Sequence, residues 1–226
     1  MKLSWRTEWP IWALILGMFL LAATSWSAAP DRIPTHWGWN GQVDRYGGKF
    51  EGLVLLPIIA TVVYLLLTFL PRVDPGRANY EQFVGAYLMI RASVVTMMAA
   101  IYGVIHLAMR GHAVRIETVV PFLVGGLLTI VGSVLGKIRP NWFVGVRTPW
   151  TLSSKLSWTK THRAAGWVFV VLGLSLMASG VSRSRAAFIA TIGVGAIGVI
   201  GTTIYSYLVW RRDPDRIPPA GTLPAE

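Results

Sequence analysis

The chain has 226 residues, of which 54% are hydrophobic and only 14% are charged, and its formal net charge at pH 7 is +11. This composition is too apolar for an ordinary soluble domain and is typical of an integral membrane protein. The absence of cysteine excludes disulfides, zinc–thiolate sites and a thiol nucleophile. Because the positive charges lie between apolar runs and not in one patch, they favour contact with an anionic membrane face over binding to nucleic acid.

Six apolar runs are long enough to cross a bilayer, which requires about 20 residues per helix. The sequence therefore predicts an all-α, polytopic membrane protein with spans at roughly 10–29, 52–71, 83–108, 118–136, 164–181 and 187–209. A short interfacial helix is expected in the loop between spans four and five. The first run also fits a cleavable signal peptide, because it has a basic start and ends in Ser27-Ala28-Ala29.

Lysine and arginine are divided unequally between the two sets of loops, with 13 on the side of both termini and 7 on the other side. Positively charged loops stay in the cytoplasm, so both termini are predicted to be cytoplasmic. Two membrane domains are expected, at 1–110 with an outer loop at 30–50, and at 111–212 with a cytoplasmic loop at 137–163. The proline-rich tail at 213–226 is expected to be disordered.

The outer loop between the first two spans is rich in glycine and polar residues. Asn40-Gly41 is a turn signal. His36, Asn40 and Asp44 are conceivable metal ligands, but a metal site needs three or four converging ligands, and this loop offers one histidine and one certain carboxylate. We favour a compact polar turn whose side chains bond its own backbone, and we expect no metal or other cofactor.

Arg91 lies inside the third apolar run, where an ionisable residue is by default a functional candidate. No acid falls within any of the six runs, so no intramembrane partner is apparent. We favour the interpretation that Arg91 snorkels to the cytoplasmic headgroups, with 92–109 spanning the hydrocarbon. His106 and His112 flank the outer end of this run and are expected to be interfacial polar residues.

Glycines in the later runs predict close helix contact. Gly132 and Gly136 form a small-xxx-small pattern, which suits packing within the molecule or in a dimer. Gly193, Gly195 and Gly198 match a dinucleotide-binding fingerprint in letters only, because no strand precedes them and no acid follows. Helix packing explains them better.

The segment 145–166 is basic and contains no acid. Pro149 favours an extended backbone at the preceding residue. Thr151 is therefore expected to cap a helix that begins at Leu152, because its hydroxyl can accept from free amides of the first turn. Such a helix would lie in the headgroup plane, with its apolar and basic side chains separated.

Two motifs resemble bacterial membrane families. The outer loop resembles an I-P-x-H-x4-G-x2-D signature of a domain of unknown function, through Pro34, His36, Gly41 and Asp44. The inner segment resembles the SdpI immunity-protein family through Asn141, Gly145, Arg147, Thr148, Pro149, Trp150, Thr151, Trp158 and His162. That family often has acids after its Leu-Ser pair, whereas this chain has Ser154 and Lys155, which removes the usual charge complement of a helix start.

The resemblance implies a non-enzymatic immunity or signal-transducing protein of the bacterial cell membrane. Founding members protect a producing cell from its own secreted peptide toxin, and they hold a transcriptional repressor at the membrane once toxin is present. The implied partners are lipid, a peptide toxin at the outer motif and a repressor at the inner motif, with no direct contact to nucleic acid. A second interpretation of the inner motif stays open, in which it only locks the loop against the bundle, with Trp150 and Trp158 as anchors at the membrane interface.

Two other classes of function are weighed against this one. A small transporter or permease component would need a buried polar path. An intramembrane enzyme would need a clustered set such as His162 with Arg91 and an acid, and since no such set is visible we expect no catalytic residue. The ligand and the oligomeric state stay open.

Overall fold

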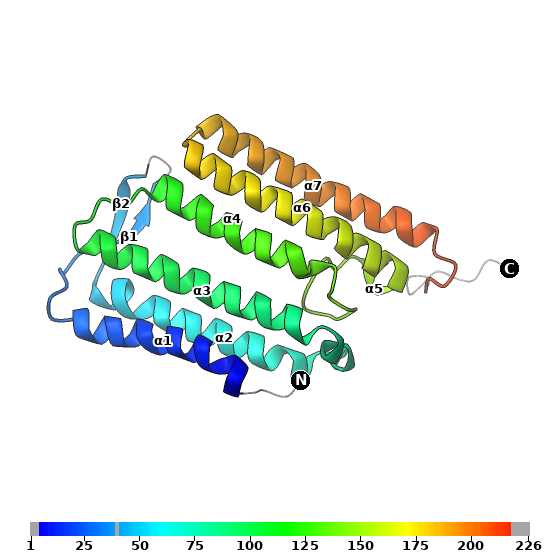
Figure 1. The fold of residues 1–226 in the computed structure, drawn as a ribbon, viewed down its shortest axis with the longest axis horizontal. Coiled ribbons are helices and arrows are strands. Elements are labelled where there is room, and N and C mark those ends of the chain that lie inside the picture. The colour runs from blue at the N-terminus through cyan, green and yellow to red at the C-terminus, as the bar shows by residue number, and fades with distance from the viewer. Residues whose placement is uncertain (1–4, 39–40, 218–226) are drawn as a thin grey trace.

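The computed structural model of the chain describes residues 5–38 and 41–217. In these ranges six long helices run back and forth between two ends of the molecule (Figure 1). All six are long and apolar enough to cross a membrane, so the predicted all-α, polytopic fold is confirmed. The helices are α1 (Trp5–Ser25), α2 (Leu55–Val73), α3 (Val84–Met109), α4 (Ile116–Leu135), α6 (Lys155–Ser182) and α7 (Arg185–Arg211).

Short elements connect the long helices. Strands β1 (Ile33–Trp37) and β2 (Val43–Gly47) form an antiparallel hairpin, and a π-helical turn at Phe50–Val54 leads from it into α2. A 3₁₀ turn at Arg77–Gln82 joins α2 to α3, and the single turn α5 (Pro149–Leu152) precedes α6. Figure 1 shows the hairpin at one end of the helices and α5 at the other.

The prediction that Arg91 snorkels is wrong. Its side chain is fully buried among α1, α2 and α3, and its Nη2 lies 2.7 Å from Oε2 of Glu8. The same Nη2 donates to the hydroxyl of Thr68 at 2.7 Å, and the hydroxyl of Tyr64 donates to Glu8 at 2.7 Å. A buried arginine requires such partners because desolvating an uncompensated charge costs several kcal/mol or more.

The partner was missed because Glu8 precedes the apolar run that begins near residue 10. Helix α1 starts earlier, at Trp5, and carries Glu8 into the bundle, where only 5% of its surface is exposed. Removing α1 would leave the Arg91 charge buried without compensation. The ion pair therefore disfavours the alternative that α1 is a cleaved signal peptide.

The second half of the molecule is held by glycines at helix crossings. A Cβ atom on Gly132 would lie 2.7 Å from the carbonyl oxygen of Gly166, and one on Gly125 would lie 2.5 Å from that of Gly173. These pairs bring the backbones of α4 and α6 into direct contact, so the close packing predicted for Gly132 occurs within the molecule. Gly136 lies more loosely against Arg163.

Helix α7 packs against α6 through two of its three fingerprint glycines. A Cβ on Gly195 would meet Leu172 at 2.7 Å, and one on Gly198 would meet Val168 at 2.6 Å, whereas Gly193 faces open space. This agrees with helix packing and not with nucleotide binding.

Candidate functional site

The hairpin is anchored firmly on the bundle. Ile33 at the start of β1 is completely buried and lies directly on the backbone of Gly52, where a Cβ would come within 2.6 Å of its Cγ2. The hydroxyl of Tyr102 on α3 donates to the carbonyl of Leu53 at 2.7 Å. The base of the hairpin is thus fixed to the π-helical turn that precedes α2, and this turn is bonded to α3.

The outer motif residues lie on this hairpin, which corrects the expected compact turn. Pro34 in β1 stands opposite Tyr46 of β2, and Gly41 has a φ of +75°, which favours glycine. His36 and Asp44 pair across the strands, with 2.6 Å between Nδ1 and Oδ1, so they bond each other and not the backbone.

Both side chains of this pair are exposed, at 64% and 50%. Across residues 5–38 and 41–217, no group of three or more His, Cys, Asp or Glu side chains gathers as a metal site would require. Asn40, the third conceivable ligand, lies outside the described residues.

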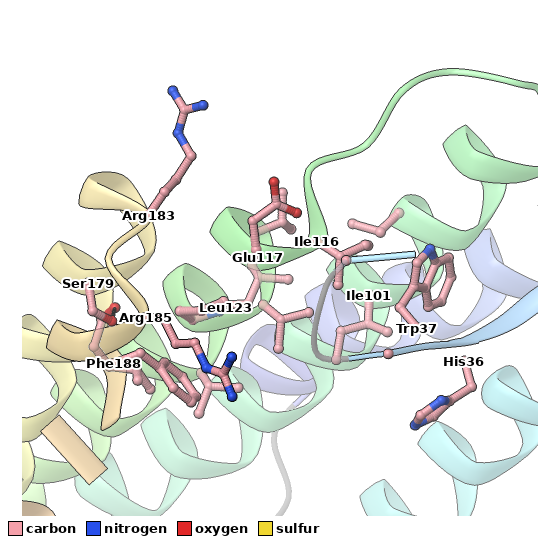
Figure 2. Close-up of a pocket in the computed structure, with 18 of the residues that line it drawn as sticks. His36, Trp37, Ile101, Ile116, Glu117, Leu123, Ser179, Arg183, Arg185 and Phe188 are labelled. Atoms are coloured by element: carbon pink, nitrogen blue, oxygen red, sulfur yellow. Dashed lines mark hydrogen bonds between the residues drawn. The ribbon is translucent and has the colours of Figure 1, made fainter. Parts of the chain in front are cut away.

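A pocket of about 830 Å³ opens beside the hairpin, as Figure 2 shows. Its walls are apolar side chains of four helices, and consecutive residues of β1 close one side. Local sequence patterns could not reveal it, because it depends on how these helices meet. The apolar wall includes Ile101 of α3, Val120 and Leu123 of α4, and Phe188 of α7.

The rim of this pocket carries charge. Glu117 stands at the start of α4, and Arg183 and Arg185 flank the turn between α6 and α7. In Figure 2, Arg185 points toward the cavity and Arg183 points away from it. Arg183 also borders an adjoining recess together with Arg115, so cations outnumber acids around the opening.

His106 is not interfacial, contrary to expectation. Only 4% of its surface is exposed, and its Nδ1 lies 3.1 Å from the carbonyl oxygen of Tyr102. Its Nε2 is buried and has no hydrogen-bond partner among the described residues. His112, by contrast, is exposed in the loop that follows α3.

At the opposite end of the helices, Asn141 organises the loop that leads from α4 to α5. Its side-chain oxygen accepts from the amides of Phe143 and Val144, and its amide group donates to the carbonyls of Arg139 and Val144. The residue is 2% exposed and uses both ends of its side chain to shape its own loop.

The same loop is tied to the first half of the molecule by Asp74, which lies just after α2. Its carboxylate accepts from the backbone amides of Trp142 and Gly76 and from the hydroxyl of Tyr80. Burial and the hydrogen bond to Asp74 raise the pKa of Tyr80, so its hydroxyl stays protonated and donates. Asp74 was not singled out in the sequence, because a lone acid in a turn carries no motif.

His162 and Gly145 form a further lock, that is, a set of contacts that holds the inner loop in place. Nε2 of His162 accepts from the backbone amide of Val146 at 3.0 Å, so Nδ1 carries the proton and donates to the carbonyl of Trp158 at 2.8 Å. The imidazole is therefore neutral and also stacks on the Trp158 ring, with centroids 4.0 Å apart. Gly145 has a φ of +116°, and a Cβ there would overlap the His162 ring.

Trp158 is completely buried and its indole N–H donates to the carbonyl of Ile138 at 2.8 Å, so it is a core residue and not an interface anchor. The other expected anchor, Trp150, packs edge-to-face on Tyr207 of α7, with ring centroids 5.2 Å apart.

The expected helix start at Leu152 is wrong. Thr148 caps α5, with Pro149 as its first residue, and Thr151 completes a capping box by bonding back to the Thr148 amide. Helix α6 then begins at Lys155, and its N-cap is Ser154, whose hydroxyl accepts from the amide of Ser157. The basic residues expected on an interfacial helix therefore lie on the first turns of a spanning helix.

Arg147 is the charged member of the motif, and it is exposed. Its guanidinium donates to the carbonyl of Trp142 at 2.7 Å. It thus bonds one loop carbonyl, and its other N–H groups are available to groups outside the protein. The same segment, 137–163, exposes basic and aromatic side chains at Lys137, Arg139, Trp142, Phe143, Lys155, Lys160 and Arg163.

The expected disorder from residue 213 onward is wrong for its first residues. Asp213 is 4% exposed and accepts a hydrogen bond from Ser154, and the amide of Ile217 donates to the carbonyl of Ser153. These contacts fasten the end of α7 to the start of α6. The remaining tail, 218–226, lies outside the described residues.

Hydrogen bonds join the side chains of five motif residues to one another or to nearby backbone groups, which favours the locking interpretation for Asn141, Thr148, Thr151, Trp158 and His162. No nucleophile paired with a base appears among the described residues at either end. The molecule is thus a multi-pass α-helical membrane protein with a polar hairpin and pocket at one end and a locked, basic loop at the other.

Comparison with known proteins finds two segments that match family models. Residues 137–206 match the model of the SdpI/YfhL protein family, and residues 13–61 match the model of a domain of unknown function, DUF1648. The immunity protein SdpI of Bacillus subtilis (strain 168) is 22% identical over 194 residues, which cover 86% of this chain and 91% of that protein. No solved structure matches the chain significantly. The resemblance predicted from the motifs is confirmed: a segment similar to the SdpI/YfhL family follows an N-terminal segment similar to DUF1648.

Proposed function

We propose that this chain is a membrane immunity protein that binds a secreted, membrane-active peptide at the end that carries the hairpin. The observation that carries the proposal is the apolar pocket of about 830 Å³ between the helices and β1. Such a volume lies in the usual range of ligand pockets, and its walls suit the apolar part of a membrane-active molecule. The similarity to an immunity protein supports the same role.

The proposed orientation places both termini in the cytoplasm and the hairpin outside. Exposed lysines and arginines gather at the end that carries α5, where the exposed acids are few, and anionic lipid on the cytoplasmic side attracts such a surface. In this orientation a secreted peptide reaches the pocket from outside.

The inner end is the proposed signalling face. The loop around Asn141 is held by Asp74, which follows α2, and Thr148 bonds Ser206 on α7 at 3.0 Å. The loop is therefore bonded to both halves of the molecule, and α7, which lines the pocket at its other end, is one of the helices that hold it. A cytoplasmic repressor with an acidic patch would fit the exposed basic and aromatic side chains, provided that bound peptide favours one helix arrangement over another.

The transporter alternative draws less support from this geometry. Buried polar side chains of α1, α2 and α3 hydrogen-bond one another and form a compact cluster, not a polar path through the bundle. The cluster consists of Glu8, Tyr64, Thr68 and Arg91. The pocket lies at the other end of these helices.

A survival assay tests the proposal. A Bacillus subtilis strain that lacks its own SdpI would express this chain and be co-cultured with toxin-producing sister cells. We expect survival to rise with the wild-type chain and to fall when the pocket is filled by Val120→Trp. The matched control is Val171→Trp, because Val171 is 54% exposed on α6 and does not line the pocket. Equal survival with and without the wild-type chain, at equal membrane abundance, would contradict the immunity role.

A further inference from the structure

The pocket has two features that an apolar cavity for a lipid tail does not need. One is the edge of a β-strand along its side, and the other is a cationic rim. Each restricts the chemistry of the occupant.

The strand edge is evident from the residues that line the cavity. Thr35, His36, Trp37 and Gly38 all border it, although neighbouring side chains of a strand point to opposite faces. Figure 2 shows the side chains of His36 and Trp37 directed to opposite sides of β1. The cavity therefore faces the edge of the strand and not one of its faces.

This edge carries backbone groups that the hairpin itself does not pair. The sheet has two strands, and β1 uses its other edge to bond β2. An unpaired strand edge is a template for another extended chain, which would donate and accept backbone hydrogen bonds along it. A lipid tail has no such groups, so the edge favours a peptide over a lipid.

The rim restricts the charge of that peptide. Arg185 points toward the cavity, and Arg183 and Arg115 add positive charge around the opening, against the single carboxylate of Glu117. Low-dielectric walls strengthen such a field. A cationic peptide end would be repelled, whereas a carboxylate would be attracted.

We infer that the pocket binds an extended apolar peptide segment that ends in a carboxylate, with its backbone along β1 and its carboxylate near Arg185. The inference deepens the proposed function and rests on it for the peptide nature of the ligand. It narrows the ligand to a class, namely apolar peptides with an anionic end, and excludes strongly cationic peptides. The volume admits only a short segment of such a peptide, not a whole amphipathic helix.

A binding assay with two peptides that differ in one group tests this inference. The full-length protein in nanodiscs of phosphatidylcholine would be titrated with a fluorescent hexapeptide of valine and leucine, prepared with a free C-terminal carboxylate or a C-terminal amide. Fluorescence anisotropy reports binding. We expect the acid to bind roughly tenfold more tightly than the amide, the usual effect of one charge-assisted hydrogen bond.

Variants assign the effect to the pocket. Arg183→Gln with Arg185→Gln should remove the preference for the acid and leave the amide unchanged. Glu117→Gln should increase the affinity for the acid, because it removes the opposing charge. Val120→Trp should abolish binding of both peptides, while Val171→Trp should not. Thermal unfolding of each variant verifies that it is folded.

Other outcomes overturn the inference. If the peptide acid and the peptide amide bind equally, the cationic rim does not select for a carboxylate. If Val120→Trp binds both peptides as the wild type does, the peptides bind outside the pocket. Displacement of both peptides by phosphatidylglycerol in the nanodisc, with no acid preference, assigns the pocket to lipid. If the chain protects cells from toxin but binds the acid and amide peptides equally, only this inference is overturned. If the chain prefers the acid peptide but does not protect cells, only the immunity role is overturned.

Discussion

The two halves of the molecule are held together by opposite means. Helices α1, α2 and α3 meet around a buried ion pair between Glu8 and Arg91, to which hydroxyl groups of α2 are hydrogen-bonded. Helices α4 and α6 meet through glycine backbones, with no charged side chain at the crossing points Gly125–Gly173 and Gly132–Gly166. Helix association in the first half depends on pairing of buried opposite charges. Helix association in the second half depends on glycines, which leave room for the backbones to touch.

This difference teaches which substitutions each half tolerates. In lipid there is no hydrophobic drive between apolar helices, so association depends on polar bonds or on close packing. The first half uses the former and the second the latter. Each can therefore be broken by a change that would do little in the other half.

The largest effect is expected from breaking the ion pair. Arg91→Met leaves the Glu8 carboxylate buried without a cation, which should lower the free energy of unfolding by about 3–5 kcal/mol. The double variant Glu8→Leu with Arg91→Met should recover much of this loss, because an apolar pair of similar size avoids the desolvation cost. Denaturant unfolding in detergent measures both. A single variant as stable as the wild type would contradict the buried pair.

A smaller loss is expected when volume is added at the glycine crossing. Gly125→Ala places a Cβ 2.5 Å from the carbonyl oxygen of Gly173 and should destabilise the protein by about 1–3 kcal/mol, the usual cost of overpacking. Gly126→Ala is the matched control on the next residue of α4, because nothing lies within 4 Å of its added Cβ. If both variants unfold alike, α4 and α6 do not meet at this glycine.

The lock at the inner loop should respond next. His162→Leu leaves the amide of Val146 and the carbonyl of Trp158 without their partner, which should cost about 1–3 kcal/mol. His162→Gln retains a hydrogen-bonding side chain and should cost less. Limited proteolysis of the 139–148 loop reports the effect locally. Equal cleavage of His162→Leu and the wild type would show that the loop is held without the imidazole.

The smallest effect on stability is expected at Arg147, the exposed charged residue of the inner motif. Arg147→Ala should change the free energy of unfolding by no more than about 1 kcal/mol, because the group is exposed and bonds one carbonyl. Membrane abundance and toxin survival should be measured side by side. Normal abundance with lost protection supports a binding role for Arg147, and lost abundance extends the locking interpretation to it.

The sequence predicted the number and placement of the spans, because long apolar runs are a direct signature of membrane helices. It also predicted the helix contact at Gly132. It did not predict the partner of Arg91, because Glu8 lies four residues inside a helix whose polar start hides it from a search of apolar runs. The predicted N-cap, Thr151, lies three residues after the observed N-cap of α5, Thr148. Both residues are good caps, and only the preference of Pro149 for the first helical position decides between them.

The sites were only partly accessible to sequence reasoning. The inner motif was found by resemblance, but the loop that carries it is also held by Asp74, which accepts from the amide of the distant Trp142. No local sequence pattern reveals this contact. The outer pocket was not foreseen, because its walls come from four helices and a strand. The division into two domains, at 1–110 and 111–212, stays a prediction.

The account depends above all on the hairpin and the inner loop facing opposite compartments, and the chain lacks cysteine, which makes this directly measurable. Single cysteines would replace Asp31, whose side chain is 99% exposed beside the hairpin, and Arg139 in the exposed inner loop. A membrane-impermeant maleimide should label Asp31→Cys in intact cells, and Arg139→Cys only after the cells are permeabilised. Labelling of both in intact cells, or of neither, would contradict the account.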